Sequence, residues 1–491
     1  MTGTDQAVAG RAGAEGPGHR PVGRHLVAVV GAGPSGLYAA GELLRSSGAV
    51  LVDVFDRLPT PFGLIRYGVA PDHPKIKSVD RVLARPFATP NVRFIGNVEI
   101  GADVSHDDLL RHYDAVIYAT GSQADRAWDL KDTAGCPVVG SARFVSWYSG
   151  HPDTAGVDFT LECHTVAVVG GGNVALDVAR VLARPAADLA STDVPDEVLD
   201  RLRTSRVRDV HVIVRGQPHQ ARFSHLELLT LGELADVRVL VHARHGVQVP
   251  GDLPAERAEA ERITRNIALL RSWHQPAGES PPSRTAPRRI HLHFGERIAA
   301  ISCADGRYRM SLAAADEDAQ AARPDLVADM VITAIGYRGR PIPELPFDDR
   351  KGLIPNVSGR VVRNGRVVRG AYVTGWIKRG PSGVIAASKS DAAETVSAVL
   401  ADLRISAGPA ASTTRETTSA PVPVRRVPFE PPASATDWEG WLNLDAYEVA
   451  AGLARGAGRV KVPQLAAMLE VCRGDRAGLQ SPASGMTHPC A

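Results

Sequence analysis

Short apolar runs that end in glycine-rich turns mark two places along this chain. Residues 27–30 and 166–169 both read VAVV, and each run is followed by a glycine-rich turn and then by a stretch with helical spacing, over 37–45 and 176–183. Apolar runs rich in β-branched residues are typical of the buried strands of a parallel sheet. We therefore predict two strand–turn–helix units.

The two turns carry the glycine spacing of dinucleotide-binding proteins. The first, GAGPSG, contains Gly31, Gly33 and Gly36, and the second, GGGNVA, begins with Gly170, Gly171 and Gly172. In such turns the first glycine permits a tight turn, the second lets the backbone approach a pyrophosphate, and the third position lets the helix pack closely on the strand. The pyrophosphate lies on the helix N-terminus, where free N–H groups and the helix dipole favour an anion. We predict two dinucleotide sites; the alternative is that each turn serves packing alone.

The residue that closes the next strand differs between the two units. Residues 50–55 are followed by Asp56, whose carboxylate can accept the ribose hydroxyls of a dinucleotide, whereas residues 209–214 are followed by Arg215. A guanidinium suits a 2′-phosphate, although an ordinary surface arginine is the alternative. We therefore predict FAD at the first turn and NADP rather than NAD at the second. A nicotinamide carries a hydride, whereas a flavin can accept two electrons and release them singly.

The remaining pattern predicts an α/β protein of two Rossmann-like three-layer dinucleotide-binding domains, with the NADP domain inserted into a discontinuous FAD domain. Further strands are expected at 91–100, 113–120, 289–294, 308–313 and 329–335, a helix at 255–273, and a long Pro- and Gly-rich loop at 59–78. The expected boundaries are a disordered tail at 1–24, the FAD domain at 25–121 and 340–404, the NADP domain at 122–339, a Pro/Ser/Thr/Ala-rich linker at 405–436, and a tail at 437–491 that docks on the FAD domain.

Composition narrows the functional class. The 491 residues carry a net charge of only +2, which argues against a nucleic-acid binder, and no run approaches the ~20 apolar residues that a membrane helix needs. The N-terminal 24 residues have no apolar core of a secretory signal, so we expect a cytoplasmic protein. Five cysteines lie scattered and form no CxxC, which predicts reduced thiols, no iron–sulfur cluster and no metal site.

Three longer phrases are more specific than the glycine turns. They are PTPFGLIRYGVAPDHPKIKS at 59–78, GGGNVALDVARVL at 170–182 and GWIKRGPSGVI at 375–385. Together and in this order they resemble the adrenodoxin reductase family of ferredoxin–NADP⁺ reductases, including its bacterial members, over about residues 26–403. The resemblance implies a flavoenzyme that passes electrons between NADPH and a small iron–sulfur carrier.

The resemblance also implies residue roles. The FAD contacts would be Ser35, Asp56, Leu64, Val98, Trp376, Gly383, Val384 and Ile385. The NADP contacts would be Gly171, Gly172, Asn173, Val174, Glu227 in FSHLELL, and again Gly383. His73 in APDHP would lie near the flavin as the candidate catalytic residue; the alternative is a histidine that only orders its loop.

One departure from the family pattern concerns the second site. The family has two adjacent arginines in the phrase RRGP, where this chain has Arg215, Gly216, Gln217 and Pro218. A charge-assisted hydrogen bond contributes about 1.5 to 3 kcal/mol, so its loss weakens NADPH preference about tenfold or more. Arg222 and Arg208 are candidates to replace it, which leaves the choice between NADP and NAD open.

Partner recognition depends on charge. Ferredoxins are acidic, so a basic rim would steer them, and the candidate is the set Arg201, Arg203, Arg206 and Arg208; a solvated helix end is the alternative. The leading hypothesis is an NADPH:ferredoxin oxidoreductase. The alternatives are a flavin-dependent NAD(P)H oxidoreductase that reduces an organic or quinone acceptor directly, and a non-catalytic dinucleotide-binding redox sensor. A glutamate-synthase-like subunit would usually add cysteine clusters, which this chain lacks.

Overall fold

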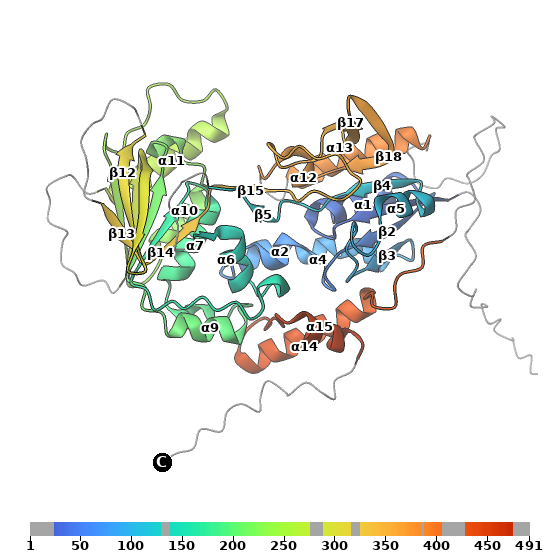
Figure 1. Cartoon of the computed structure of the whole chain (residues 1–491), viewed down its shortest axis with the longest axis horizontal. Coiled ribbons are helices and arrows are strands. Elements are labelled where there is room, and N and C mark those ends of the chain that lie inside the picture. Colours follow the sequence, from blue (N-terminus) through green and yellow to red (C-terminus); the bar gives the residue numbers. More distant parts are fainter. Residues whose placement is uncertain are drawn as a thin grey trace, which may run out of the picture.

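The computed structural model describes residues 24–128, 138–274, 288–315, 325–383, 387–404 and 428–474. Two sheets, one mostly parallel and one fully parallel, lie side by side, each with its own helices (Figure 1). The second sheet is built from chain that lies between strands of the first, so the predicted insertion of one Rossmann-like domain into another is confirmed. We call them the first domain and the inserted domain.

The first domain is built on a seven-stranded sheet. Its strands are His25–Val30 (β1), Val50–Phe55 (β2), Val92–Ile95 (β3), Ala115–Tyr118 (β4), Asn356–Val357 (β16), Arg360–Arg363 (β17) and Arg366–Val373 (β18). They lie in the order β16-β17-β18-β4-β1-β2-β3, and the strands from β18 to β3 are parallel. Strand β1 is apolar throughout its centre because both faces of a parallel sheet are covered by other elements.

Helices complete the first domain. They are Pro34–Ser46 (α1), Leu64–Tyr67 (α2), Pro74–Lys77 (α3), Asp80–Leu83 (α4), His106–His112 (α5), Trp376–Arg379 (α12) and Ala387–Asp402 (α13). Helix α1 has a proline at its first position, where the missing N–H is not needed, and it shares a buried core with α13. The predicted loop at 59–78 contains the one-turn helices α2 and α3, which the proline and glycine content concealed.

The inserted domain is built on a six-stranded parallel sheet. Its strands are Val139–Gly140 (β6), Thr165–Val169 (β7), Asp209–Val214 (β8), Val237–Ala243 (β9), Arg288–Phe294 (β10) and Met330–Thr333 (β14). They lie in the order β6-β14-β7-β8-β10-β9. Its helices are Ser141–Tyr148 (α6), Asn173–Ala183 (α7), Ala186–Leu189 (α8), Asp196–Arg203 (α9), His225–Gly232 (α10) and Arg257–Ser272 (α11).

A separate three-stranded antiparallel sheet packs on the inserted domain. It consists of Glu296–Ala304 (β11), Arg307–Ala314 (β12) and Leu326–Ala328 (β13). Its apolar residues share a core with Ala167 of β7 and Ile213 of β8. The strand expected at 308–313 therefore belongs to this small sheet and not to the parallel one. Two short strands, Ala124–Asp125 (β5) and Tyr337–Arg338 (β15), pair where the chain enters and leaves the inserted domain.

The C-terminal region contributes two helices, Trp438–Arg455 (α14) and Leu465–Cys472 (α15), which run along one side of both domains (Figure 1). Trp441 lies in the core of the first domain, and Arg455 donates to the backbone of Val194 in the inserted domain at 2.7 Å. The C-terminal region thus contacts both domains. Of the predicted linker, residues 405–427 lie outside the described residues; Thr436 forms an antiparallel bridge with Gly96.

Two further expectations concern membrane-spanning helices and the state of the cysteines. Among the described residues, no helix combines the length and apolar character needed to cross a membrane. Cys163 and Cys472 have free thiols, but Cys303 is disulfide-bonded, so the expectation of reduced thiols is wrong for Cys303. Scattered spacing alone gives no information on which cysteines pair.

Candidate dinucleotide sites

The first glycine turn is tightly enclosed by the backbone of its own domain. A Cβ at Gly31 would lie 2.6 Å from the carbonyl oxygen of Ala119, and one at Gly36 would overlap the carbonyl oxygen of Gly31. Both positions therefore require glycine for close approach of backbone. Helix α1 begins at this turn without a side-chain cap, whereas α5 is capped by Ser105. The uncapped N–H groups fit the pyrophosphate of a dinucleotide.

The carboxylate of Asp56 lies against this turn. It accepts hydrogen bonds from the backbone N–H of Ala32 at 2.8 Å and of Leu58 at 3.0 Å. Burial raises the pKa of Asp56, and these two bonds lower it in part. Because each carboxylate oxygen has further acceptor capacity, the ribose contact predicted for Asp56 is compatible with these bonds.

Segments distant in sequence meet at the first turn. A Cβ at Gly63 would lie 3.0 Å from the Cα of Gly33, which places the neighbouring Leu64 beside the turn. The N–H of Val98 donates to the carbonyl of Asp56 at 3.0 Å. Gly375, with φ of 77°, packs against Ser35 so closely that a Cβ would overlap its hydroxyl, and Trp376 follows directly. The predicted FAD residues Ser35, Asp56, Leu64, Val98 and Trp376 thus come from segments that meet here.

The remaining predicted FAD segment lies beyond α12. Gly383 has a φ of 80°, and a Cβ there would lie 3.5 Å from Nη1 of Arg379. Val384 and Ile385 lie outside the described residues.

The second turn is enclosed at its first two glycines and open at its third: a Cβ at Gly170 would overlap the carbonyl oxygen of Ala334, and one at Gly171 would lie 2.6 Å from Cγ1 of Val214. The N–H of Gly170 donates to the carbonyl of Ile213 at 3.0 Å, but a Cβ at Gly172 would meet no atom within 4 Å. Helix α7 begins here without a side-chain cap, as α1 does. The side chain of Asn173 instead accepts a hydrogen bond from the N–H of Ser224 at 2.8 Å and so attaches the turn to α10. These features leave room and N–H donors for a second pyrophosphate.

Three arginines were candidates for a 2′-phosphate at this turn. Arg215 is exposed at the carboxyl end of β8, and the N–H of the exposed Arg222 donates to the carbonyl of Gly171 at 2.9 Å. Arg208 lies at the opposite end of β8, where its N–H bonds the carbonyl of His164 at 2.8 Å. A six-residue strand spans about 20 Å, so Arg208 cannot replace the missing arginine whereas Arg222 is beside the turn.

A buried ion network joins the loop of His73 to the inserted domain. Nε2 of His73 lies 3.0 Å from Oε2 of Glu227 on α10 and 3.4 Å from Oδ1 of Asp177 on α7. Arg180, fully buried on α7, donates to Asp177 at 2.5 Å, to Glu227 at 3.0 Å and to Asp72 at 2.5 Å. The predicted site residues His73 and Glu227 are therefore in contact with each other across the domain boundary.

The network sets the protonation of its members. Burial lowers the pKa of His73, but the carboxylates of Asp177 and Glu227 outweigh it and raise the pKa to about 9. Burial raises the pKa of Asp177, whereas His73 and Arg180 hold the pKa of Glu227 below its usual value against the effect of burial. The sequence analysis missed Arg180, although an arginine three residues after Asp177 in a helix with a buried apolar face is a signal of an internal ion pair.

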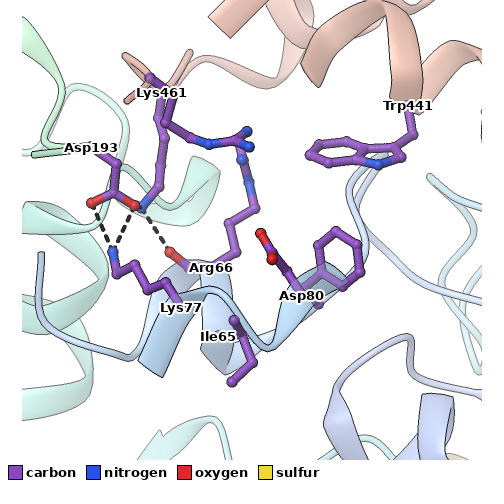
Figure 2. A pocket seen from close by; sticks show the side chains of 9 residues that line it. Ile65, Arg66, Lys77, Asp80, Asp193, Trp441 and Lys461 are labelled. Carbon is purple, nitrogen blue, oxygen red and sulfur yellow. Dashed lines mark hydrogen bonds and ion pairs between the residues drawn. The ribbon is translucent and has the colours of Figure 1, made fainter. Parts of the chain in front are cut away.

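A second polar junction attaches the C-terminal region to the same loop, beside a cavity of about 50 Å³ (Figure 2). Nζ of Lys461 donates to the carbonyls of Arg66 at 2.7 Å and Ser149 at 2.9 Å, and it pairs with Asp193 at 2.9 Å. Lys77 also bonds Asp193, at 2.6 Å. Burial lowers the pKa of Lys461, while the two lysines hold the pKa of Asp193 well below its usual range despite its burial. Lys461 and Asp193 carried no motif and were not predicted.

The comparisons with known proteins agree with this architecture. Residues 25–219 match the pyridine nucleotide-disulphide oxidoreductase family. A probable ferredoxin/ferredoxin–NADP reductase of Mycobacterium tuberculosis is 40% identical over 459 residues, which cover 90% of this chain and 75% of the relative. NADPH-ferredoxin reductase FprA of Mycobacterium leprae is 37% identical over 473 residues, 93% of this chain and 100% of that protein.

A solved structure of a relative has a similar fold. Mycobacterium tuberculosis FprA in complex with NADPH superposes with a TM-score of 0.78 at 35% identity, over 92% of this chain and 100% of that one. The fold and the paired glycine turns define the chain as a two-domain pyridine nucleotide-dependent oxidoreductase. Within that class, the chain belongs to the ferredoxin–NADP reductase family, as the resemblance of its motifs predicted.

Proposed function

We propose that this protein is an NADPH:ferredoxin oxidoreductase, in which electrons pass from NADPH through FAD to a ferredoxin-type iron–sulfur protein. The observation that carries the proposal is the presence, in one chain of this family, of a glycine turn bonded by Asp56 and a second glycine turn flanked by Arg215 and Arg222. When bound, the flavin supplies two-electron uptake and one-electron release. The protein binds and orients both nucleotides.

At the first turn, the N–H groups of α1 hold the pyrophosphate of FAD and Asp56 holds the ribose. Ser35, Leu64, Val98, Trp376 and the segment Gly383, Val384 and Ile385 are proposed to contact FAD. The contacts of Gly63 with Gly33 and of Gly375 with Ser35 support this, because they position these segments around one turn.

At the second turn, Gly170, Gly171, Gly172, Asn173 and Val174 are proposed to hold the pyrophosphate of NADPH. Arg215 and Arg222 flank the turn and bind the 2′-phosphate. Gly383 approaches the nicotinamide nucleotide. Glu227, whose carboxylate is buried between His73 and Arg180, acts as a positioning residue that holds the His73 loop against α10.

For His73 we propose the same positioning role. Its Nε2 lies 3.0 Å from Oε2 of Glu227 and 2.6 Å from Nη2 of Arg180. The ring is therefore already part of the buried ion network between the domains. This favours the alternative in which the histidine orders its loop over a direct catalytic one.

The partner is proposed to be an acidic ferredoxin-type protein that is steered by positive charge. The predicted basic set on and after α9 is partly neutralised, because Arg201 pairs with Asp158 at 2.9 Å and Arg203 with Asp200 at 2.7 Å. Arg206 and Arg208 belong to the same stretch. Neutralising Arg201 or Arg203 should therefore slow ferredoxin reduction only slightly.

The proposal is tested by anaerobic stopped-flow reduction of the flavin with NADPH and with NADH, followed by cytochrome c reduction with and without added ferredoxin. We expect faster bleaching with NADPH and cytochrome c reduction that requires ferredoxin. Rapid ferredoxin-independent reduction of a quinone would favour the direct oxidoreductase. A protein that purifies without flavin and takes up none on reconstitution would contradict every enzymatic alternative.

A further inference from the structure

Four histidines lie together on one face of the inserted sheet, in mid-strand and away from the residues of the second turn. They are His211 on β8, His242 on β9, and His291 and His293 on β10. In the parallel register His211 pairs with His291 and His242 pairs with His293. Because side chains alternate along a strand, His291 and His293 share a face, and the four rings form one stacked cluster with neighbouring centroids 4.3 and 4.6 Å apart.

The ring nitrogens converge. Nδ1 of His211 lies 2.9 Å from Nε2 of His293, and Nε2 of His242 lies 3.0 Å from Nδ1 of His291. One nitrogen from each of His211, His291 and His293 can be chosen so that all three lie within 4.8 Å of one another. Zinc–nitrogen bonds of about 2.0–2.1 Å place tetrahedral ligand nitrogens about 3.3 Å apart. An imidazole lone pair lies in the ring plane, and the rings of His211 and His291 are stacked with an interplanar angle of 7°, so one of these rings must turn out of the stack for both to bind one ion.

Carboxylates support the outer edges of two rings. Oδ1 of Asp209 lies 3.1 Å from Nε2 of His291, and Oε2 of the buried Glu296 lies 3.4 Å from Nδ1 of His293. A carboxylate behind an imidazole fixes the tautomer and the ring orientation of a metal ligand. In each ring the opposite nitrogen is the one directed at a neighbouring histidine.

Access also suits a cation. The side chains of His291 and His293 are 14% and 11% exposed, which leaves a route from solvent.

A second group of possible ligands in the described residues does not share these properties. Ligand atoms of His73, Asp177 and Glu227 also gather within 4.8 Å. There the guanidinium of Arg180 already contacts all three side chains, so a cation would meet a positive charge in the same space. This group is the ion network at the domain boundary and not a metal site.

We propose that His211, His291 and His293 bind a divalent transition-metal ion, and specifically Zn²⁺. Three imidazoles, two of them backed by carboxylates, form a donor set that zinc accepts. The ion would tie β8 and β10 together and has no part in electron transfer, so the site does not depend on the proposed function. The sequence analysis predicted no metal because it considered cysteine spacing; these histidines come from two separate strands.

The test uses the untagged, FAD-loaded full chain after chelator treatment. Titration calorimetry and metal analysis with Zn²⁺ alone should give one ion per chain and a rise in Tm of several degrees. The double variant His291→Asn/His293→Asn should lose the ion and the rise in Tm. His245→Asn, an exposed histidine three residues after His242, is the matched control and should retain both.

Several outcomes separate the alternatives. FAD content reports folding; if the double variant loses its flavin, His211→Gln on β8 replaces it in the same measurement. Electron paramagnetic resonance of the Cu²⁺-loaded oxidised protein should show coupling to imidazole nitrogens. The proposal is overturned if the folded chain binds no stoichiometric zinc, or if zinc binding is unchanged in the folded cluster variants, which would assign the ion to another site.

Discussion

The two glycine turns have similar sequences but different surroundings. At the first turn the segments that contain Ala119, Gly63 and Gly375 press against the backbone, and Asp56 bonds the turn from β2. At the second turn Gly172 faces open space, and the flanking Arg215 and Arg222 are exposed. Both turns are closed at their first glycine, by Ala119 at Gly31 and by Ala334 at Gly170, so they differ at the later positions, where further segments pack on the first turn and Gly172 of the second faces open space.

This difference matches two kinds of ligand. An enclosed turn built from distant segments suits a cofactor that stays bound, because its release requires several contacts to open together. An open turn with exposed arginines suits a nucleotide that binds and leaves in every catalytic cycle, steered by charge. This difference supports the proposed placement of FAD in the first domain and of NADPH in the inserted domain.

The sharpest test of the comparison is a pair of glycine substitutions. In Gly36→Ala the Cβ would overlap the carbonyl oxygen of Gly31, so we expect a loss of about 3 kcal/mol or more in unfolding free energy and a protein depleted of FAD. In Gly172→Ala the Cβ meets no atom, so we expect at most about 1 kcal/mol of destabilisation, full flavin content and a raised KM for NADPH. Flavin absorbance per chain, urea unfolding and steady-state kinetics measure these effects.

Gly251→Ala is the control, because Gly251 also has open space around it but lies far along the chain from either turn. It should change neither flavin content nor the KM for NADPH. If Gly36→Ala and Gly172→Ala depleted FAD equally, the proposed placement of FAD at the first turn would be wrong.

The sequence predicted the parts of each site that depend on local pattern. The strands and helices around both turns, Asp56 and Arg215 follow from apolar runs and glycine spacing, and β8 begins and ends where expected. The expected strand at 91–100 was too long, because beyond β3 the chain leaves the sheet and Gly96 pairs with Thr436 instead. The sequence analysis also missed strand β9. The His73–Arg180 network, the Lys461 junction and the histidine cluster each join side chains from elements that are distant in sequence. The periodic pattern of apolar residues along one chain does not show which distant elements meet.

The next largest effect concerns the arginines of the open site. If Arg215 binds the 2′-phosphate as proposed, Arg215→Ala removes a charge-assisted contact, so we expect the KM for NADPH to rise about tenfold or more, equivalent to about 1.5 to 3 kcal/mol, with little change for NADH. Arg222→Ala should give the same selective loss, because its backbone bonds Gly171. The ratio of kcat/KM for NADPH to that for NADH is the measurement.

Arg208→Ala is the matched control, since Arg208 lies at the opposite end of β8. It should leave the ratio unchanged. Equal losses for NADPH and NADH in Arg215→Ala would mean that this arginine does not read the 2′-phosphate.

The smallest effect concerns the buried ion network of His73, which joins the two domains. The pKa of His73 is raised to about 9, above its ordinary value of about 6.5 in an unfolded chain, so protonated His73 stabilises the folded state. That contribution is fully present below about pH 6.5 and is lost as the pH rises toward 9. We expect the wild type to lose about 1 to 2 kcal/mol more than His73→Gln between pH 7 and 9.

Urea unfolding of both FAD-loaded proteins at the two pH values gives the comparison. Taking the difference between the wild type and the variant removes the titration of distant groups such as Lys461, which changes equally in both. The groups that face His73 are Asp72, Asp177, Arg180 and Glu227, and Glu227→Gln should therefore reduce the same pH dependence by removing one carboxylate that holds the proton. Parallel losses in wild type and His73→Gln would show that His73 is neutral in the folded protein, in which case the junction would rest on Arg180 and its carboxylates alone.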